Sequence, residues 1–215
     1  MNRTIPDPET TACFTGHRTV PPSEEPALRF RLSSALQQAY EGGYRTYMCG
    51  GARGFDTLAA EAVIRFRETH GDVRLFLAIP CANQASRWTE EEKARRKAIL
   101  ERADEVRVLS ETYYDGCMHA RNLFMVDASS LCFCWMKRFE GGTWFTVRSA
   151  LRHSLTVINL AMPDPNPPVF RENIWNCIFT SPSASANALT APLSLSPLQR
   201  KKRMHMSRPS SGKQN

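Results

Sequence analysis

The chain has 215 residues, of which 42% are hydrophobic and 23% charged, proportions of a globular protein that exclude a fibrous or wholly disordered chain. No run approaches the roughly 18 apolar residues of a membrane-spanning helix, and the N-terminus lacks a signal-peptide stretch, so we expect a soluble, cytoplasmic protein. The net charge is +7, but residues 200–215 carry six positive and no negative charges, which leaves +1 for residues 1–199. The charge therefore does not support a broad basic face, and only the tail could contact nucleic acid, through weak, salt-sensitive contacts.

Strands alternate with helices over the first 160 residues. Apolar runs predict strands at 11–15, 46–49, 73–79, 105–109, 130–135 and 155–160, and helical periodicity predicts helices at 26–41, 55–69, 89–103, around 121–126 and at 145–153. This alternation predicts a single Rossmann-like α/β domain over residues 8–162, with a mainly parallel sheet covered by helices on both faces. Ligands of such sheets bind outside the carboxyl ends of the strands.

Residues 163–215 differ in composition from the domain, because proline and serine dominate without periodicity. We expect a largely disordered basic tail. The alternative is that the apolar residues between 170 and 179 dock on the sheet edge as a short helix or strand.

The seven cysteines lack the clustered spacing of a zinc site. The closest pair, Cys132 and Cys134, has the spacing of two residues on one face of a strand. We therefore predict buried thiols that pack in the core, and no metal.

The second strand ends in a glycine-rich segment, Gly50, Gly51, Ala52, Arg53 and Gly54, which opens the following helix. Backbone N–H groups at such a turn suit an anion, although neither G-x-G-x-x-G spacing nor the Lys-Ser/Thr of a P-loop is present. The alternative is that the glycines serve only the tight turn. The next acidic residue, Asp56, is either favoured by the helix dipole or a ligand contact.

The first strand ends in Gly16, His17 and Arg18, at the sheet edge where Arg53 also lies. Cationic donors that converge on one edge suit a phosphate or carboxylate, although solvated loop residues are the simpler interpretation.

Gln84, Arg87 and Trp88 follow the third strand and supply an aromatic face and another guanidinium. A nucleobase or sugar could stack there, whereas a tryptophan more often anchors a core.

Gly141, Gly142 and Thr143 form an expected turn after the fifth strand. Thr143 is expected to cap the next helix, and the glycines would let the backbone approach a ligand closely. This is a second anion-suited helix start on the same edge of the sheet.

Together these motifs resemble the YpsA-related branch of the SLOG superfamily over residues 11–161. The resemblance implies a Rossmann-like domain that binds nucleotides or nucleotide-derived ligands, with relatives among the DNA-processing protein DprA and the Lonely Guy phosphoribohydrolases. The residues that carry it are Thr15 to Arg18, Gly50 to Asp56 with Ala59 to Glu61, Pro80 with Gln84, Arg87 and Trp88, Arg121 and Asn122 with Met125 to Asp127, and Gly141 to Thr143 with Val147 and Arg148.

The chain departs from the enzymatic relatives at one position. Lonely Guy enzymes carry P-G-G-x-G-T-x-x-E, whose glutamate serves N-glycosidic cleavage, whereas Thr146 stands where that acid would fall. The remaining candidates for a catalytic carboxylate are Asp56, Glu61 and Asp127, so whether the chain is an enzyme stays open.

The leading hypothesis is a sensor or carrier of a nucleotide-derived ligand of unknown identity. A phosphoribohydrolase-like enzyme and a DprA-like DNA-associated module are the alternatives, and a homo-oligomer stays open. In the leading hypothesis the phosphate is held by Gly50, Gly51, Arg53, Gly54, Gly141, Gly142 and Thr143, while sugar or base contacts His17, Arg18, Gln84, Arg87 and Trp88.

Overall fold

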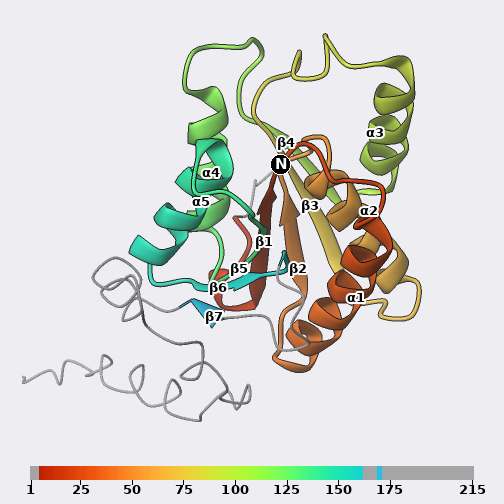
Figure 1. Ribbon diagram of the computed structural model, residues 1–215, viewed down its shortest axis with the longest axis vertical. Helices are drawn as coiled ribbons and strands as arrows, with labels where there is room; N and C mark the ends of the chain where they lie inside the picture. Colours follow the sequence, from red (N-terminus) through yellow and green to blue (C-terminus); the bar gives the residue numbers. More distant parts are fainter. Residues whose placement is uncertain (1–4, 162–168, 171–215) are drawn as a thin grey trace, which may run out of the picture.

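The computed structural model describes residues 5–161 and 169–170 (Figure 1). A 3-10 turn at Pro8–Thr10 precedes the first strand. The elements that follow are β1 (Thr11–Gly16), α1 (Glu25–Glu41), β2 (Thr46–Cys49), α2 (Phe55–Arg67), β3 (Arg74–Ile79), α3 (Glu90–Arg102), β4 (Glu105–Val108), α4 (Cys117–Asp127), β5 (Leu131–Trp135), α5 (Gly141–Arg152), β6 (Thr156–Asn159) and β7 (Val169–Phe170).

The strands form one sheet in the order β4-β3-β2-β1-β5-β6-β7. The first six strands run parallel, and β7 pairs antiparallel with β6, with Phe170 opposite Val157. The predicted Rossmann-like fold is thus confirmed. Val169 and Phe170, which the sequence assigned to the tail, add a strand to the sheet. The rest of the predicted tail, including the apolar residues up to 179, lies outside the described residues.

The helices cover both faces of the sheet because of the strand order. The chain moves from β1 to β4 in one direction, so three right-handed crossovers place α1, α2 and α3 on one face. It then returns to β5 beside β1, so α4 and α5 cover the other face (Figure 1). Strand order therefore reverses between β1 and β5, and the carboxyl ends of these two strands flank the switch point at which open α/β sheets bind ligands.

Each face of the sheet has its own core. Phe14, Tyr47 and Phe55 pack with α1 and α2, whereas Met48, Phe76 and Val147 pack with α4 and α5. The six cysteines within the described residues are buried free thiols, as predicted, and Cys177 lies outside those residues. None of the described helices is long and apolar enough to cross a membrane.

Candidate functional site

The carboxyl ends of the strands open onto a crevice of about 650 Å³. Its walls come from the segments that follow β1, β2, β3, β4 and β5 and from α4, so it extends over the switch point between β1 and β5. Most of the residues predicted from the sequence line it: Gly16, His17, Arg18, Arg53, Asp56, Gln84, Trp88, Arg121, Asn122, Gly141, Gly142 and Thr143.

The start of α5 presents unused hydrogen-bond donors to this crevice. The helix begins at Gly141, so Gly141 to Thr143 form its first turn rather than a turn before a helix at 145. The side chain of the N-cap residue Glu140 makes no capping bond, and within the described residues the N–H groups of this first turn have no partner. Helix starts with free N–H groups carry a partial positive charge and attract anions.

Thr143 occupies the third position of α5 and does not cap it, contrary to the sequence prediction. The residue is only 7% exposed, and no described residue pairs with its hydroxyl group. The hydroxyl of Thr146, by contrast, already has a hydrogen-bond partner, because it donates to the Gly142 carbonyl at 2.8 Å. The hydroxyl of Thr143 therefore borders the crevice and has no protein partner among the described residues, and it is not among the fully buried unpaired atoms.

Arg121 and Asn122 of α4 are also buried at the crevice, at 6% and 8% exposure. The Arg121 guanidinium donates to the carbonyls of Gly50 and Ala78, and its Nε donates to Asn122 Oδ1 at 2.7 Å. Since this bond occupies the amide oxygen of Asn122, the amide nitrogen is the atom left over, and it has no partner within the described residues. Burial lowers the pKa of Arg121, and the charge of Asp56 opposes that shift.

Asp56 uses the N–H groups of the glycine-rich segment. Its Oδ2 accepts from the Ala52 N–H at 3.3 Å. Burial raises the pKa of Asp56, while Arg121 and the backbone N–H groups of Ala52 and Gly50 oppose the shift. The N–H groups of this segment are therefore already paired with the carboxyl group of the chain's own Asp56, and Gly50 and Gly51 do not line the crevice.

Gly54 lets the start of α2 pack closely against the end of β1. Like Gly50 and Gly51, it does not line the crevice. It has a φ of +70°, and a Cβ there would overlap the Arg18 backbone. The Phe55 N–H donates to the His17 carbonyl at 3.2 Å. This close approach, which glycine permits, positions His17 and Arg18 at the crevice.

The imidazole of His17 is held as an acceptor. Its Nε2 accepts from the Lys137 N–H at 3.0 Å, and the ring packs edge-on against Trp135 at 5.7 Å between centroids. Burial lowers the pKa of His17, as do the charges of Arg138 and Lys137, against the opposing charge of Glu140. The neighbouring Arg18 has no ion pair within the described residues.

Trp88 lies at the side of the crevice next to α3. The guanidinium carbons of Arg53 and Arg96 are 5.8 and 5.9 Å from the centroid of its ring. Gln84 is fixed beside them, because its amide donates to the Gly50 carbonyl and accepts from Arg96, both at 3.3 Å. Arg87 is exposed and does not line the crevice.

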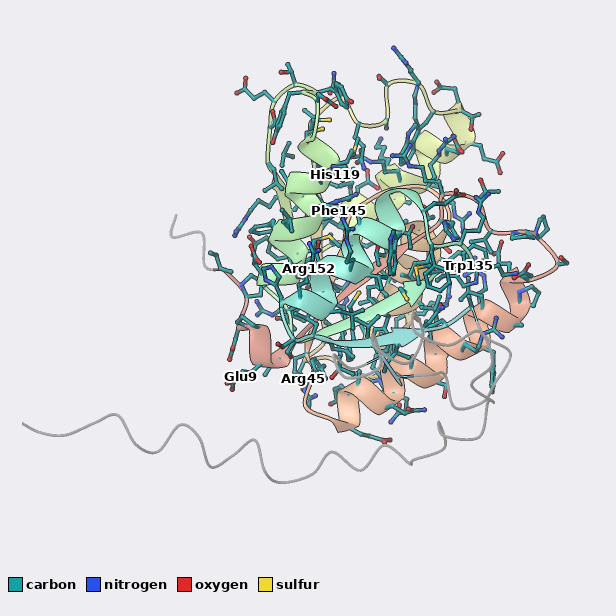
Figure 2. All side chains as sticks on the ribbon, turned by 60° about the vertical axis from the view of Figure 1, so that its left-hand side comes forward. Glu9, Arg45, His119, Trp135, Phe145 and Arg152 are labelled. Carbon is teal, nitrogen blue, oxygen red and sulfur yellow. The ribbon has the colours of Figure 1, made fainter. Side chains whose placement is uncertain are left out.

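Several lining residues were missed by the sequence analysis. Tyr113, Asp115, Met118 and His119 come from the segment after β4 and from α4, and Arg138 comes from the segment after β5. Figure 2 shows His119 above Phe145, and the two rings stack at 4.2 Å between centroids. No motif marked these residues, and the segment between β4 and α4, residues 109–116, is too short for its length alone to indicate function.

Two of the three candidate catalytic carboxylates lie away from the crevice. Glu61 of α2 pairs with Arg29 of α1 and Arg95 of α3, at 3.0 and 2.9 Å. Asp127, at the end of α4, pairs with His153 at 3.0 Å. Of the three, Asp56 alone borders the crevice. No group of three or more His, Cys, Asp or Glu side chains suited to a metal ion was found among the described residues.

Strand order, crossover pattern and the crevice at the switch point define a Rossmann-like α/β domain. The family model YpsA, described as the YspA SLOG family, matches residues 23–157, and the chain belongs to this family.

Two curated relatives and one solved structure illustrate the similarity. The UPF0398 protein BH1768 of Halalkalibacterium halodurans is 32% identical over 91 residues, 41% of this chain and 48% of that protein. A UPF0398 protein of Bacillus pumilus is 28% identical over 133 residues, 59% of this chain and 72% of that protein. DNA processing protein A (DprA) from Streptococcus pneumoniae superposes with a TM-score of 0.50 at 16% identity, over 71% of this chain and 49% of that one. The chain thus spans about half the length of the first relative and of DprA, and the likeness to DprA shows the fold alone.

Proposed function

We propose that the crevice binds a nucleotide or nucleotide-derived ligand, with a phosphate at the start of α5, and that the chain acts as a sensor or carrier of that ligand. The observation that carries this proposal is the open first turn of α5 at the switch point, with the unpaired Thr143 hydroxyl beside it.

Donors that border the crevice without a protein partner favour a bound ligand. The Asn122 amide nitrogen and the Thr143 hydroxyl both lack a partner among the described residues, so both can pair with a ligand in the crevice. Phosphate oxygens are strong acceptors that would pair with these groups and with the N–H groups of α5. Arg18, which has no ion pair in the described chain, supplies a cation at the same crevice.

The phosphate is assigned to α5 rather than to the glycine-rich segment, because Asp56 already pairs with the N–H groups of that segment. The sugar and base would contact the remaining crevice residues, His17, Gln84 and Trp88. Membership of the SLOG family supports a nucleotide-derived ligand. Thr146 stands where the glutamate of the hydrolases would fall, and its hydroxyl already donates to the Gly142 carbonyl, so this position gives no support to a hydrolase.

The test is isothermal titration calorimetry with AMP, ADP and ADP-ribose on the wild type, Thr143→Val and Asn122→Ala. Hydrogen bonds to charged groups contribute about 1.5–3 kcal/mol, so each variant should weaken binding about tenfold or more. Thr156→Val is the matched control, because Thr156 is the first residue of β6 and so lies at the amino ends of the strands, away from the crevice. This variant should bind the ligands like the wild type. Absence of binding by the whole panel, or unchanged affinity in Thr143→Val, would contradict the proposal.

A further inference from the structure

Strand β4 is the outermost strand of the described sheet, at the edge opposite β7. In a parallel ladder, alternate residues of an edge strand bond to the neighbouring strand, and the residues between them direct their N–H and C=O groups away from it. The Leu109 N–H donates to the Ile79 carbonyl of β3 at 2.9 Å, so the odd-numbered residues of β4 face β3. The backbone groups of Val106 and Val108 therefore point outward, and no described strand pairs with them.

The side chains of these two valines form an uncovered apolar strip beside α3. Val106 and Val108 lie opposite Leu77 and Ile79 of β3, which belong to the core under α1, α2 and α3. Since paired residues of neighbouring strands point to the same face of a sheet, the valines face the layer of α3. The only buried residue of α3 is Ile99, which lies in the same core as Leu77 and Ile79. Val106 and Val108 stay 41% and 45% exposed, so α3 does not cover the valine strip.

Arg107, the one cation of β4, does not shield the outer edge of the strand. Edges that avoid pairing with another strand commonly present a lysine or a proline to solvent, and β4 contains neither. The guanidinium carbon of Arg107 lies 5.1 and 5.4 Å from the ring centroids of Phe76 and Phe124, on the face that α4 covers. Arg107 also pairs with Glu105 at 2.7 Å, and its side chain is only 11% exposed. The outward N–H and C=O groups are therefore accessible to a further strand.

The sequence of β4 is complementary to itself in one antiparallel register. When Val106 lies opposite Val106 of a second copy, Glu105 of each copy lies opposite Arg107 of the other, and opposite charges at facing positions stabilise a strand pair. The neighbouring register that uses the same outward groups pairs Val106 with Val108. It places the two Arg107 residues opposite one another, and like charges at facing positions are destabilising. Charge therefore selects the first register, whose two-fold axis passes between the two Val106 residues.

We propose that β4 pairs antiparallel with β4 of a second copy of this chain, which joins the two sheets and brings the two valine strips side by side between the α3 helices. The two Val106 residues exchange N–H···O=C bonds on the axis. A strand of four residues makes a small contact, so the association is weak and reversible. The carboxyl ends of the strands point in opposite directions in the two copies. Each crevice is therefore complete in its own copy, and the inference does not depend on the proposed function.

Sedimentation velocity of the full chain over a range of concentrations tests the inference, and the wild type should shift from monomer to dimer as the concentration rises. Val106→Asp brings two carboxylates together on the axis and should raise the dissociation constant at least about tenfold. Phe30→Asp is the matched control, because Phe30 is 77% exposed on α1, and it should dimerise like the wild type. Val106→Pro removes an N–H that does not bond to β3. It should therefore fold like the wild type and weaken the dimer about tenfold, because one hydrogen bond is lost from each copy.

Amide hydrogen exchange of the wild type identifies what covers the edge. A second copy should slow the exchange of the Val106 N–H progressively as the protein concentration rises. Slow exchange at every concentration would show that a segment of the same chain occupies the edge, and would overturn the inference. A wild type that stays monomeric up to about 1 mM would also overturn it, and this result needs no variant. A dimer that neither Val106 variant weakens would place the interface elsewhere and overturn it as well.

Discussion

Gly50 illustrates how a residue chosen for ligand binding can serve the fold instead. The guanidinium of Arg121, 71 positions further along the chain, donates to its carbonyl and fills the space where a Cβ would lie. The sequence could show that a glycine is required at this strand end. It could not show that the requirement comes from α4, because that contact exists only after the sheet has formed.

Gly50→Ala is therefore expected to destabilise the protein. The added methyl group would displace the buried guanidinium and its hydrogen bonds, which should lower the free energy of unfolding by about 2 kcal/mol or more. Gly71→Ala is the control, since no atom lies within 4 Å of a Cβ there, and it should change stability by less than about 0.5 kcal/mol. Urea denaturation measures both, and equal midpoints for the two variants would refute this account of Gly50.

His17 should make stability depend on pH. Its folded-state pKa lies below the ordinary value of 6.5, because burial and the charges of Arg138 and Lys137 disfavour the imidazolium. The unfolded chain therefore binds the proton first as the pH falls. The stabilisation is complete above about pH 6.5 and declines as the pH falls toward the folded pKa.

Thermal melts of the wild type and His17→Gln between pH 8 and pH 5 test this dependence. The wild type should lose more stability than the variant as the pH falls through 6.5, because only the wild type loses the bond from the Lys137 N–H to a neutral ring. Parallel curves for the two proteins would show that His17 does not titrate as described.

At the scale of elements, Glu61 joins three helices. Its carboxylate accepts from Arg29 of α1 and Arg95 of α3. Burial alone would raise the pKa of Glu61, but the hydrogen bonds and charges of Arg95 and Arg29 outweigh it, and the pKa is lowered. The residue considered as a catalytic acid from sequence is thus an ion-pair centre on the surface of the helical layer.

Glu61→Gln should lower the free energy of unfolding by about 1 kcal/mol near pH 7, a modest value because the arginine partners are partly solvated. Since the folded pKa is depressed, the stabilisation is present above the ordinary value near 4.5 and is lost as the pH falls through the folded pKa. The difference between variant and wild type should therefore vanish in acid. A loss that persists at pH 2–3, or altered AMP binding in the variant, would contradict a purely structural role.

The helices and strands were predictable because their signals are local. Apolar periodicity located all six parallel strands and the five helices of the described domain, whose bounds differ from the predicted ones by a few residues. The start of α5 was placed too late, at 145, because two glycines usually mark a turn, whereas Gly141 and Gly142 form the first turn of this helix. β7 was foreseen only in the alternative that residues from 170 onward dock on the sheet edge, because its two residues gain pairing only from the edge of β6.

The crevice follows from the topology of the whole sheet. The rule that ligands bind at the carboxyl ends of parallel strands brought His17, Asp56, Trp88 and Thr143 together from separate segments of the sequence. The sequence could not reveal the wall formed by Tyr113 and His119, because α4 comes to lie beside α5 only when β5 inserts next to β1. It also could not decide between two anion-suited turns, a choice that depends on where the carboxylate of Asp56 points.

The position of the phosphate can be tested by amide chemical shifts, measured by NMR while the ¹⁵N-labelled protein is titrated with AMP. The largest shifts are expected for the N–H groups of Gly141, Gly142 and Thr143, because they have no partner within the described chain and would bond to the phosphate. The N–H groups of Gly50 and Ala52 should move little, since the carboxylate of Asp56 holds them. Large shifts at Gly50 and Ala52 with an unmoved α5 would place the phosphate in the glycine-rich segment and contradict the account.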